Sequence, residues 1–125
     1  MLETCVTYSV LPASDLQRAI AWYRDKLELE PEDTAEGGVR YRTGTDAKIF
    51  VYETANAGTA QNTAMCWIVP DIVEARDHLR ERGVQFEDYD FPGLKTEDAI
   101  ATDDTGRSAW FRDSEGNYLC LTQPA

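Results

Sequence analysis

The chain has 125 residues, of which 42% are hydrophobic and 28% are charged, and its formal net charge is −11. This composition predicts a globular domain that is large enough to form a core without disulfide bonds. The acidic balance would repel a phosphate backbone, so we expect no nucleic-acid partner, whereas a cationic ligand would be attracted.

Neither a membrane span nor a disulfide framework is indicated. No apolar run approaches the roughly 20 residues that a membrane-spanning helix needs. Residues 1–4 lack the basic start and apolar stretch of a signal peptide. The three cysteines, Cys5, Cys66 and Cys120, have no paired spacing, and we interpret them as reduced thiols. We therefore expect a cytoplasmic protein without a membrane partner.

The chain begins with a predicted strand and helix. Residues 2–11 are rich in β-branched and aromatic residues, which predicts a strand that ends at Pro12. Ser14 and Gln17 have the spacing of a capping box, so we expect a helix to begin there and to end near Leu27. The apolar face of this helix repeats at helical spacing and consists of Leu16, Ala19, Ile20, Tyr23 and Leu27.

A hairpin and a linker are expected after this helix. Residues 32–38 are acidic and end in two glycines, which indicates a turn region. Residues 39–43 and 48–54 predict the two strands of a hairpin. Residues 55–63 are small and polar, which favours a linker.

The second half repeats the same order. Residues 64–69 predict a strand, and Asp71 with Glu74 forms another capping box, which opens a helix that Gly83 ends. Residues 84–87 indicate a short strand. Residues 89–97 indicate a loop, which would be either a lid over a binding site or an ordinary connection. The remaining strands are expected at residues 98–102, 107–112 and 118–123.

This repetition predicts two βαβββ modules in a single domain over residues 1–125. Module one covers about residues 1–54, the linker about residues 55–63, and module two about residues 64–125. One module alone would leave a sheet face uncovered. Two modules side by side would curl into a concave sheet with the helices outside.

Two motifs resemble those of a known superfamily. The run from Asp15 to Tyr23 resembles the first-helix signature of the vicinal oxygen chelate superfamily, and the run from Ala109 to Leu119 resembles its terminal hairpin. This group includes glyoxalase I, bleomycin-resistance proteins and extradiol dioxygenases. The resemblance implies an α+β fold of paired βαβββ modules, which form a concave mixed sheet cup with helices outside and often assemble as a homodimer.

Metal-dependent members of this superfamily place four ligands on the inner strands, and the resemblance maps these positions onto the chain. They fall near Tyr8, at Tyr52 or Phe50, near Ala64 and at Cys120. Divalent sites of this kind need imidazole or carboxylate ligands, which these residues do not provide. A register shift by one residue would bring only Glu53 inward. We therefore predict no metal and no cofactor.

The only histidine, His78, lies inside the second predicted helix, where we expect a solvated side chain. Catalysis by a Ser/His/Asp or Cys/His arrangement would require this residue, which is on the wrong element.

Strand alternation predicts which side chains line the cup. The candidate ligand-binding residues are Tyr8, Phe50, Tyr52, Cys66, Ser108, Trp110 and Cys120, with Val10 and Ala64 beside them. An apolar, aromatic lining suits a flat organic ligand. The alternative is that these side chains fill the core of a curled sheet. Trp67 and Phe111 are expected on the opposite faces under the helices, and Trp22 in the core or at a dimer contact.

Three functions remain open. The first is metal-free binding of a small aromatic or amphipathic molecule, for which the acidic balance would favour a cation, by a protein of the bleomycin-resistance type. The second is an atypical enzyme of the superfamily, a lyase, isomerase or dioxygenase, with Tyr8 or Tyr52 as the acid–base group and Cys120 as the nucleophile. The third is an accessory or partner-binding domain with a filled cup.

Overall fold

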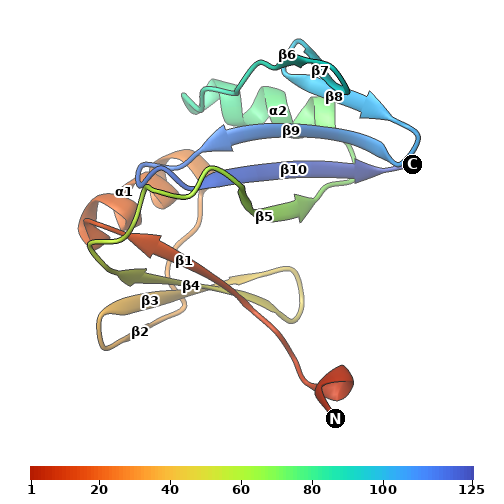
Figure 1. Ribbon diagram of the computed structural model, residues 1–125. Helices are drawn as coiled ribbons and strands as arrows, with labels where there is room; N and C mark the ends of the chain where they lie inside the picture. Colours follow the sequence, from red (N-terminus) through yellow and green to blue (C-terminus); the bar gives the residue numbers. More distant parts are fainter.

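The computed structural model describes all 125 residues, which form two mixed sheets and two α-helices (Figure 1). Module one contains β1 (Ser9–Ala13), α1 (Leu16–Leu27), β2 (Asp33–Ala35), β3 (Gly38–Thr43) and β4 (Ala47–Glu53). Module two contains β5 (Thr63–Ile68), α2 (Ile72–Glu81), β6 (Asp90–Phe91), β7 (Leu94–Glu97), β8 (Ile100–Asp103), β9 (Gly106–Arg112) and β10 (Tyr118–Pro124). The α+β class and the repeated module are therefore confirmed.

The strand pairing shows the repeat directly. The first sheet has the order β1-β4-β3-β2, and the second has the order β5-β10-β9-β8-β7-β6. In each module the first strand pairs in parallel with the last strand, and the other neighbours are antiparallel. The two sheets remain open and separate, without hydrogen-bonded strands between them.

Both helices begin at an aspartate that caps their first turn. Asp15 accepts a hydrogen bond from the backbone N–H of Arg18 at 3.0 Å, so Asp15 is the cap of α1. The sequence had indicated Ser14 as the capping residue, and that prediction is wrong. Asp71 accepts from the N–H of Glu74 at 3.0 Å, which confirms the expected cap of α2. The carboxylates satisfy N–H groups that have no partner inside the helix.

The first predicted strand is wrong in its extent. Residues 2–4 form a short 3-10 helix, and β1 runs from Ser9 to Ala13, through the proline that was expected to stop it. Because β1 is the edge strand of its sheet, Pro12 can lack an N–H group there without losing an interior ladder bond. The segment before β1 projects away from the sheets (Figure 1).

Three other expectations need correction. The acidic turn region over residues 32–38 contains the short strand β2, which pairs with β3. Residues 84–87 form no strand and only one isolated bridge, between Phe86 and Phe111. The loop expected over residues 89–97 folds as the β6–β7 hairpin, because Gly93, with φ of 84°, permits a tight turn.

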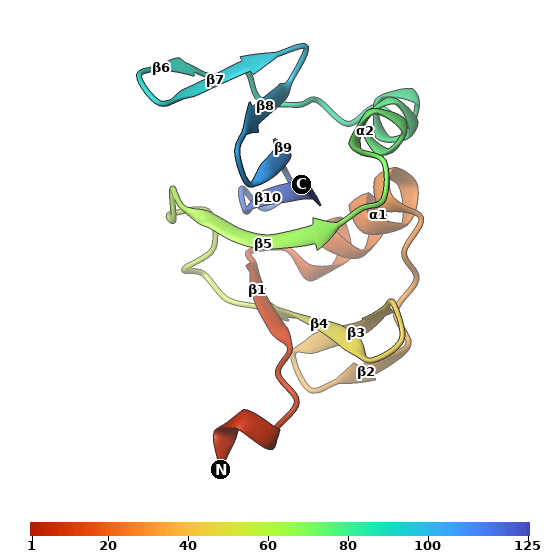
Figure 2. The same cartoon turned by 90° about the vertical axis from the view of Figure 1, so that its right-hand side faces the viewer.

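One hydrophobic core joins the modules. Tyr23 on α1 stacks on Tyr41 of β3 with ring centroids 5.4 Å apart, and Trp22 stacks on Phe111 of β9 at 6.3 Å. Figure 2 shows α1 above the first sheet and α2 beside the second, so that α1 contacts both modules. Trp22 therefore packs against the core, and Phe111 is fully buried, as the sequence predicted. Neither helix is long and apolar enough to cross a membrane.

Candidate functional site

Alternation along the strands gives each sheet one core face and one open face. In β4, Ile49 and Val51 are buried in the core, whereas Phe50 and Tyr52 lie on the other face. In β10, Leu119 and Leu121 belong to the core, and the intervening Cys120 lies on the opposite face. The candidate ligand-binding residues thus lie on the two open faces, away from the helices.

The open face of module one carries an aromatic pair. The rings of Phe50 and Tyr52 have centroids 6.2 Å apart and planes inclined by only 10°, so the two rings stack nearly parallel to each other. The Phe50 ring lies against Gly38, where a side-chain Cβ would come within 2.6 Å of the ring. Tyr8 is 59% exposed and Tyr52 is 36% exposed. These rings are therefore accessible to a ligand and are not part of the core.

A small cavity adjoins this aromatic pair. It has a volume of about 220 Å³ and is lined by Tyr8, Arg40, Lys48, Ile49 and Phe50. The Arg40 guanidinium lies 5.7 Å from the centre of the Phe50 ring, which is the range of a cation–π interaction. The cavity thus combines an aromatic wall with two cationic side chains.

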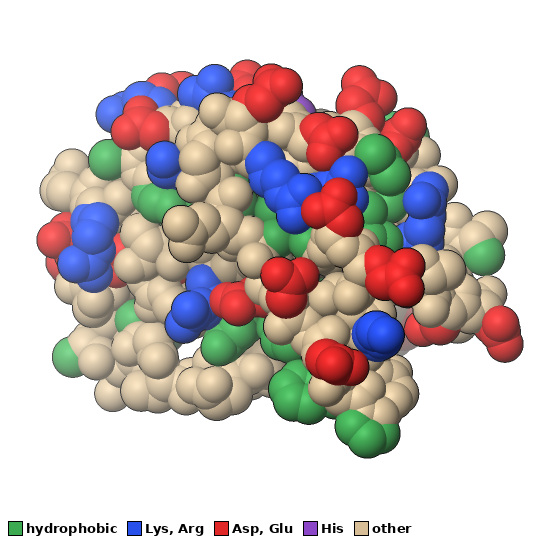
Figure 3. Space-filling model, turned by 90° about the horizontal axis from the view of Figure 1, so that it is seen from above, with side chains coloured by type: hydrophobic (Ala, Val, Ile, Leu, Met, Phe, Trp, Pro, Cys, Tyr) green, Lys and Arg blue, Asp and Glu red, His purple; other side chains and the backbone are tan.

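Carboxylates partly neutralise this basic face. Arg40 pairs with Asp33 at 3.1 Å, while Glu32 accepts from Arg42 at 2.7 Å and lies 3.5 Å from Lys48. The hydrogen bond from Arg42 lowers the pKa of Glu32. Three cations against two carboxylates leave a small local excess of positive charge. Figure 3 views the molecule from the other side, over α2 and β6–β8, where basic and acidic side chains are interspersed without a large patch of one sign.

The open face of module two has a different chemistry. Cys66, Ser108, Trp110 and Cys120 lie together on β5, β9 and β10. The hydroxyl of Ser108 donates to that of Thr122 at 3.2 Å, and the indole N–H of Trp110 donates to the Thr63 hydroxyl at 3.1 Å. The indole N–H of Trp110 therefore has its hydrogen-bond partner within the chain.

The region over residues 89–97, for which the sequence left a lid and an ordinary connection equally open, lies beside Trp110. Tyr89, which precedes the β6–β7 hairpin, packs its ring edge-on to Trp110 with centroids 5.6 Å apart. Phe91 in the hairpin is 60% exposed and lies 5.9 Å from Tyr89. Aromatic residues of module two thus extend from the sheet onto the hairpin.

The structure does not bring all candidate residues into one cavity. Phe50 and Tyr52 belong to the first sheet and Tyr8 directly precedes its strand β1, whereas Cys66, Ser108, Trp110 and Cys120 belong to the second sheet. The cavity beside Phe50 is lined by residues of module one alone. Within one chain, the predicted cup is therefore divided into two half-sites.

The positions that correspond to metal ligands do not fit a divalent cation. They hold Tyr8, Tyr52 or Phe50, Ala64 and Cys120, and no group of three or more His, Cys, Asp or Glu side chains is placed to hold a metal. Burial raises the pKa of the Cys120 thiol to about 12, with a further contribution from Cys66. A thiol that stays protonated at neutral pH is a poor metal ligand and a poor nucleophile, which argues against its expected role in an atypical enzyme.

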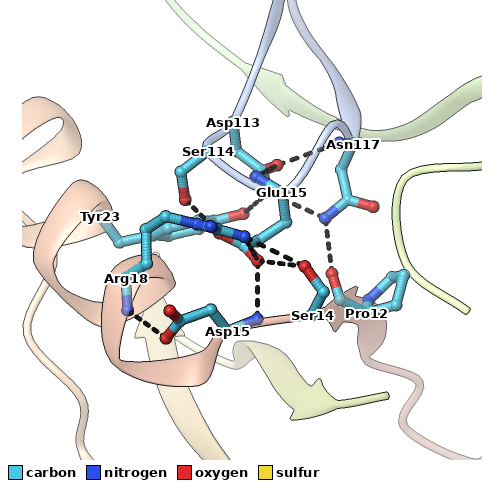
Figure 4. Close-up of polar contacts among 9 residues, drawn as sticks. All are labelled: Pro12, Ser14, Asp15, Arg18, Tyr23, Asp113, Ser114, Glu115 and Asn117. Atoms are coloured by element: carbon cyan, nitrogen blue, oxygen red, sulfur yellow. Dashed lines mark hydrogen bonds and ion pairs between the residues drawn. The ribbon is translucent and has the colours of Figure 1, made fainter. Parts of the chain in front are cut away.

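A polar network that the sequence did not reveal fastens the turn after β9 to α1 (Figure 4). Glu115, whose side chain is fully buried, accepts hydrogen bonds from Arg18 at 2.8 and 2.9 Å and from the N–H of Asp15 at 3.0 Å. The Tyr23 hydroxyl donates to Asp113 at 2.7 Å. The only available signal was the Asp113–Asn117 turn, which indicated a change of direction but not a buried contact.

Burial of the Glu115 carboxyl acts to raise its pKa, but hydrogen bonds from Arg18, Ser114 and the N–H of Asp15 outweigh this and lower the pKa to about 2. The residue therefore remains ionised and holds the two modules together. His78 is an exposed residue of α2 that contacts Glu28 at the end of α1, as expected for a side chain outside the site.

The sequence profile of the Glyoxalase/Bleomycin resistance protein/Dioxygenase superfamily matches residues 6–121. The chain belongs to this superfamily. The fold of this superfamily accounts for the two modules and their open faces. The two open faces differ from each other in their side chains. No curated protein sequence matches the chain.

Solved structures agree with this assignment of the fold. TnmS3, an antibiotic binding protein from Streptomyces sp. CB03234, is 21% identical with a TM-score of 0.73, and the match covers 100% of this chain and 99% of that one. A bleomycin-binding protein complexed with bleomycin is 18% identical with a TM-score of 0.72, covering 98% and 100%. A glyoxalase/bleomycin resistance protein from Catenulispora acidiphila DSM 44928 is 21% identical with a TM-score of 0.68, covering 98% and 100%.

Proposed function

We propose that this protein binds a small aromatic or amphipathic molecule without a metal ion. The observation that carries the proposal is the pair of half-buried Phe50 and exposed Tyr52 on the open face, whose nearly parallel rings adjoin a cavity of about 220 Å³. A flat ligand on such a surface gains burial and stacking, worth roughly 0.5–1.5 kcal/mol per aromatic pair beyond the buried area. Two of the similar structures are described as an antibiotic binding protein and a bleomycin-binding protein, which supports a role in binding an organic molecule.

The charge of the ligand follows from two opposing influences. The net charge of −11 attracts a cation at long range, which is the sequence-based hypothesis. The side chains at the cavity itself are Arg40 and Lys48, and screening over about 8 Å at physiological salt makes such near charges dominate a bound state. We therefore propose a ligand with an anionic or neutral substituent at this end, and a cationic ligand remains the competing prediction.

A second copy of the chain would complete the site. Each open face carries only some of the aromatic candidate residues. A two-fold axis would place module one of each copy opposite module two of the other copy, which forms two equivalent sites. We propose a homodimer on this basis. Light scattering over a wide concentration range should give twice the chain mass of 14.1 kDa, and a constant 14.1 kDa would remove this part of the proposal.

The binding proposal is tested by titration calorimetry with three naphthalene derivatives that share one ring system. They are 2-naphthoate, naphthylmethanol and naphthylmethylammonium. We expect saturable binding in the order anion, neutral and cation, by dialysed protein whose metal content is checked by elemental analysis. The reverse order would restore the cationic ligand, and one tightly held divalent ion per chain would contradict metal-free binding.

Two matched variants locate the binding. Phe50→Ala removes one ring of the stacked pair and should weaken binding by roughly 1–3 kcal/mol, the scale of one buried aromatic contact. Phe91→Ala removes an exposed aromatic residue outside the cavity and should have a smaller effect. Equal affinity in wild-type protein and Phe50→Ala, with both folded by circular dichroism, would remove this face from the proposed function.

A further inference from the structure

Two thiols lie side by side on the open face of module two. Cys66 of β5 and Cys120 of β10 are direct partners in the parallel strand pair. Neighbouring strands are about 4.8 Å apart, which lies within the range of about 4.4–6.8 Å between the Cα atoms of a disulfide. The pair therefore has the backbone separation that a disulfide needs, without a change of register.

The two thiols differ in their access to solvent. Cys66 is exposed, whereas Cys120 is only 3% exposed and donates a hydrogen bond to the carbonyl oxygen of Leu121 at 3.3 Å. Burial, together with the adjacent Cys66 thiol, raises the pKa of Cys120 to about 12, against the opposing hydrogen bonds of Ser108 and Ala109. A dissolved reagent thus meets Cys66 first, while Cys120 is held behind it as a thiol.

We propose that Cys66 and Cys120 form a dithiol site that a peroxide oxidises reversibly to an intramolecular disulfide. The site takes a small two-electron oxidant at Cys66, and Cys120 is the resolving partner. This inference rests on the strand register and does not depend on the proposed ligand.

The reaction balances with hydrogen peroxide as the oxidant. The Cys66 thiolate attacks one peroxide oxygen, so that an S–O bond forms, the O–O bond breaks and the departing hydroxide takes up a proton as water. The protonated Cys120 thiol is a poor nucleophile toward a dissolved molecule, but the Cys66 sulfenic acid is held beside it on the neighbouring strand, and this proximity offsets the low reactivity. The Cys120 sulfur then attacks the Cys66 sulfenic acid, so that the S–S bond forms and the S–O bond breaks. The oxygen leaves as a second water with the Cys120 proton. Two thiols are oxidised to a disulfide, and one peroxide is reduced to two waters.

The remaining thiol provides an internal control. Cys5 is exposed next to the N-terminal 3-10 helix and does not lie in either sheet. An oxidant should therefore attack it without producing an intramolecular disulfide with Cys66 or Cys120.

The test is mild oxidation of the reduced full chain with hydrogen peroxide. Intact mass should fall by two hydrogen atoms, titratable thiols should fall from three to one, and peptide mapping should join Cys66 to Cys120. Cys5→Ser should still form the disulfide, and dithiothreitol should reverse it. Tryptophan fluorescence should also change, because Cys120 lies opposite Trp110 in the β9–β10 pair, and Trp110→Phe should suppress that change.

The variants Cys66→Ser, Cys120→Ser and Cys120→Ala should each abolish the intramolecular disulfide. Cys120→Ala is the control for Cys120→Ser, because the serine variant buries a polar hydroxyl. The proposal is overturned if wild-type protein gains oxygen atoms without forming the Cys66–Cys120 link. It is equally overturned if chains join through Cys5 while both sheet thiols stay reduced, or if a disulfide forms as readily in folded Cys120→Ala.

Discussion

The two modules share a core pattern and differ on their open faces. Leu11 lies beside Val51 in the β1–β4 pair, as Trp67 lies beside Leu121 in the β5–β10 pair, and all four face the common core. At the neighbouring open positions, Val10 lies beside Phe50 in module one, whereas Cys66 lies beside Cys120 in module two.

The two modules thus differ in the positions that face solvent and agree in the positions that form the core. The alternating apolar positions must be retained in both copies, because each supplies one wall of the same core. The open positions face away from that core, so they can hold an apolar and aromatic pair in one copy and a dithiol in the other. We therefore expect functional residues at the open positions, where the two modules differ, and stabilising contacts where the two modules meet.

The largest expected effect concerns the contact that joins the modules. Glu115→Gln removes the charge that pairs with Arg18 but keeps the side-chain size, and we expect a loss of roughly 2–3 kcal/mol in the free energy of unfolding, less than for a fully buried pair because Arg18 is 52% exposed. Glu30→Gln is the control. Its pair with Arg24 is exposed on both sides, so the loss should stay below about 1 kcal/mol. Similar urea midpoints for the two variants would contradict the joining role of Glu115.

The same carboxylate predicts a pH dependence. The pKa of Glu115 lies at about 2 in the folded state against an ordinary value of 4.5, so its stabilising contribution is complete above about pH 4.5. That contribution is lost as the pH falls from about 4.5 to 2, and the shift corresponds to roughly 3 kcal/mol. Urea unfolding across this window should show a steeper decline for wild-type protein than for Glu115→Gln. Parallel profiles would show that Glu115 does not titrate in this way.

Two stacked tyrosines give a smaller and sharper contrast. Tyr23 donates to the buried Asp113, so Tyr23→Phe should cost roughly 1.5–3 kcal/mol. The hydroxyl of Tyr41 is buried without a hydrogen-bond partner, and burial raises the pKa of Tyr41 to about 12. Removing that hydroxyl in Tyr41→Phe should leave stability unchanged or raise it by up to about 1 kcal/mol. Thermal unfolding of both variants checks the difference, and equal losses would refute it.

The sequence predicted the fold well where local signals, such as a capping residue or the alternation of apolar residues along a strand, determine the structure. The capping aspartate of α2 and the alternation in β4 and β10 all depend on neighbours close in the chain. Predictions for β1, β2 and the β6–β7 hairpin went wrong because these elements depend on edge positions and long-range pairing. A proline at an edge strand and an acidic strand at the far edge are tolerated only in their tertiary setting.

The sequence predicted which sheet face each candidate residue occupies, but not how the two faces are arranged relative to each other. Alternation placed Phe50, Tyr52, Trp110 and Cys120 on the faces opposite the core, as they lie in the structure. It could not show that the faces belong to separate sheets, nor that Thr63 satisfies the Trp110 indole. The buried Glu115 was missed because its partner Arg18 is 97 residues away in the sequence.

The most direct test of the central claim is a map of where an aromatic ligand binds. The competing place is the apolar groove between the helices, which has a volume of about 230 Å³ and includes Trp67 and Leu79. Ring-current shifts from 2-naphthoate, followed by heteronuclear NMR on assigned protein, distinguish the two. We predict saturable shifts at Phe50, Tyr52 and Arg40, with Trp67 and Leu79 unchanged. Shifts confined to Trp67 and Leu79 would contradict binding at the open faces.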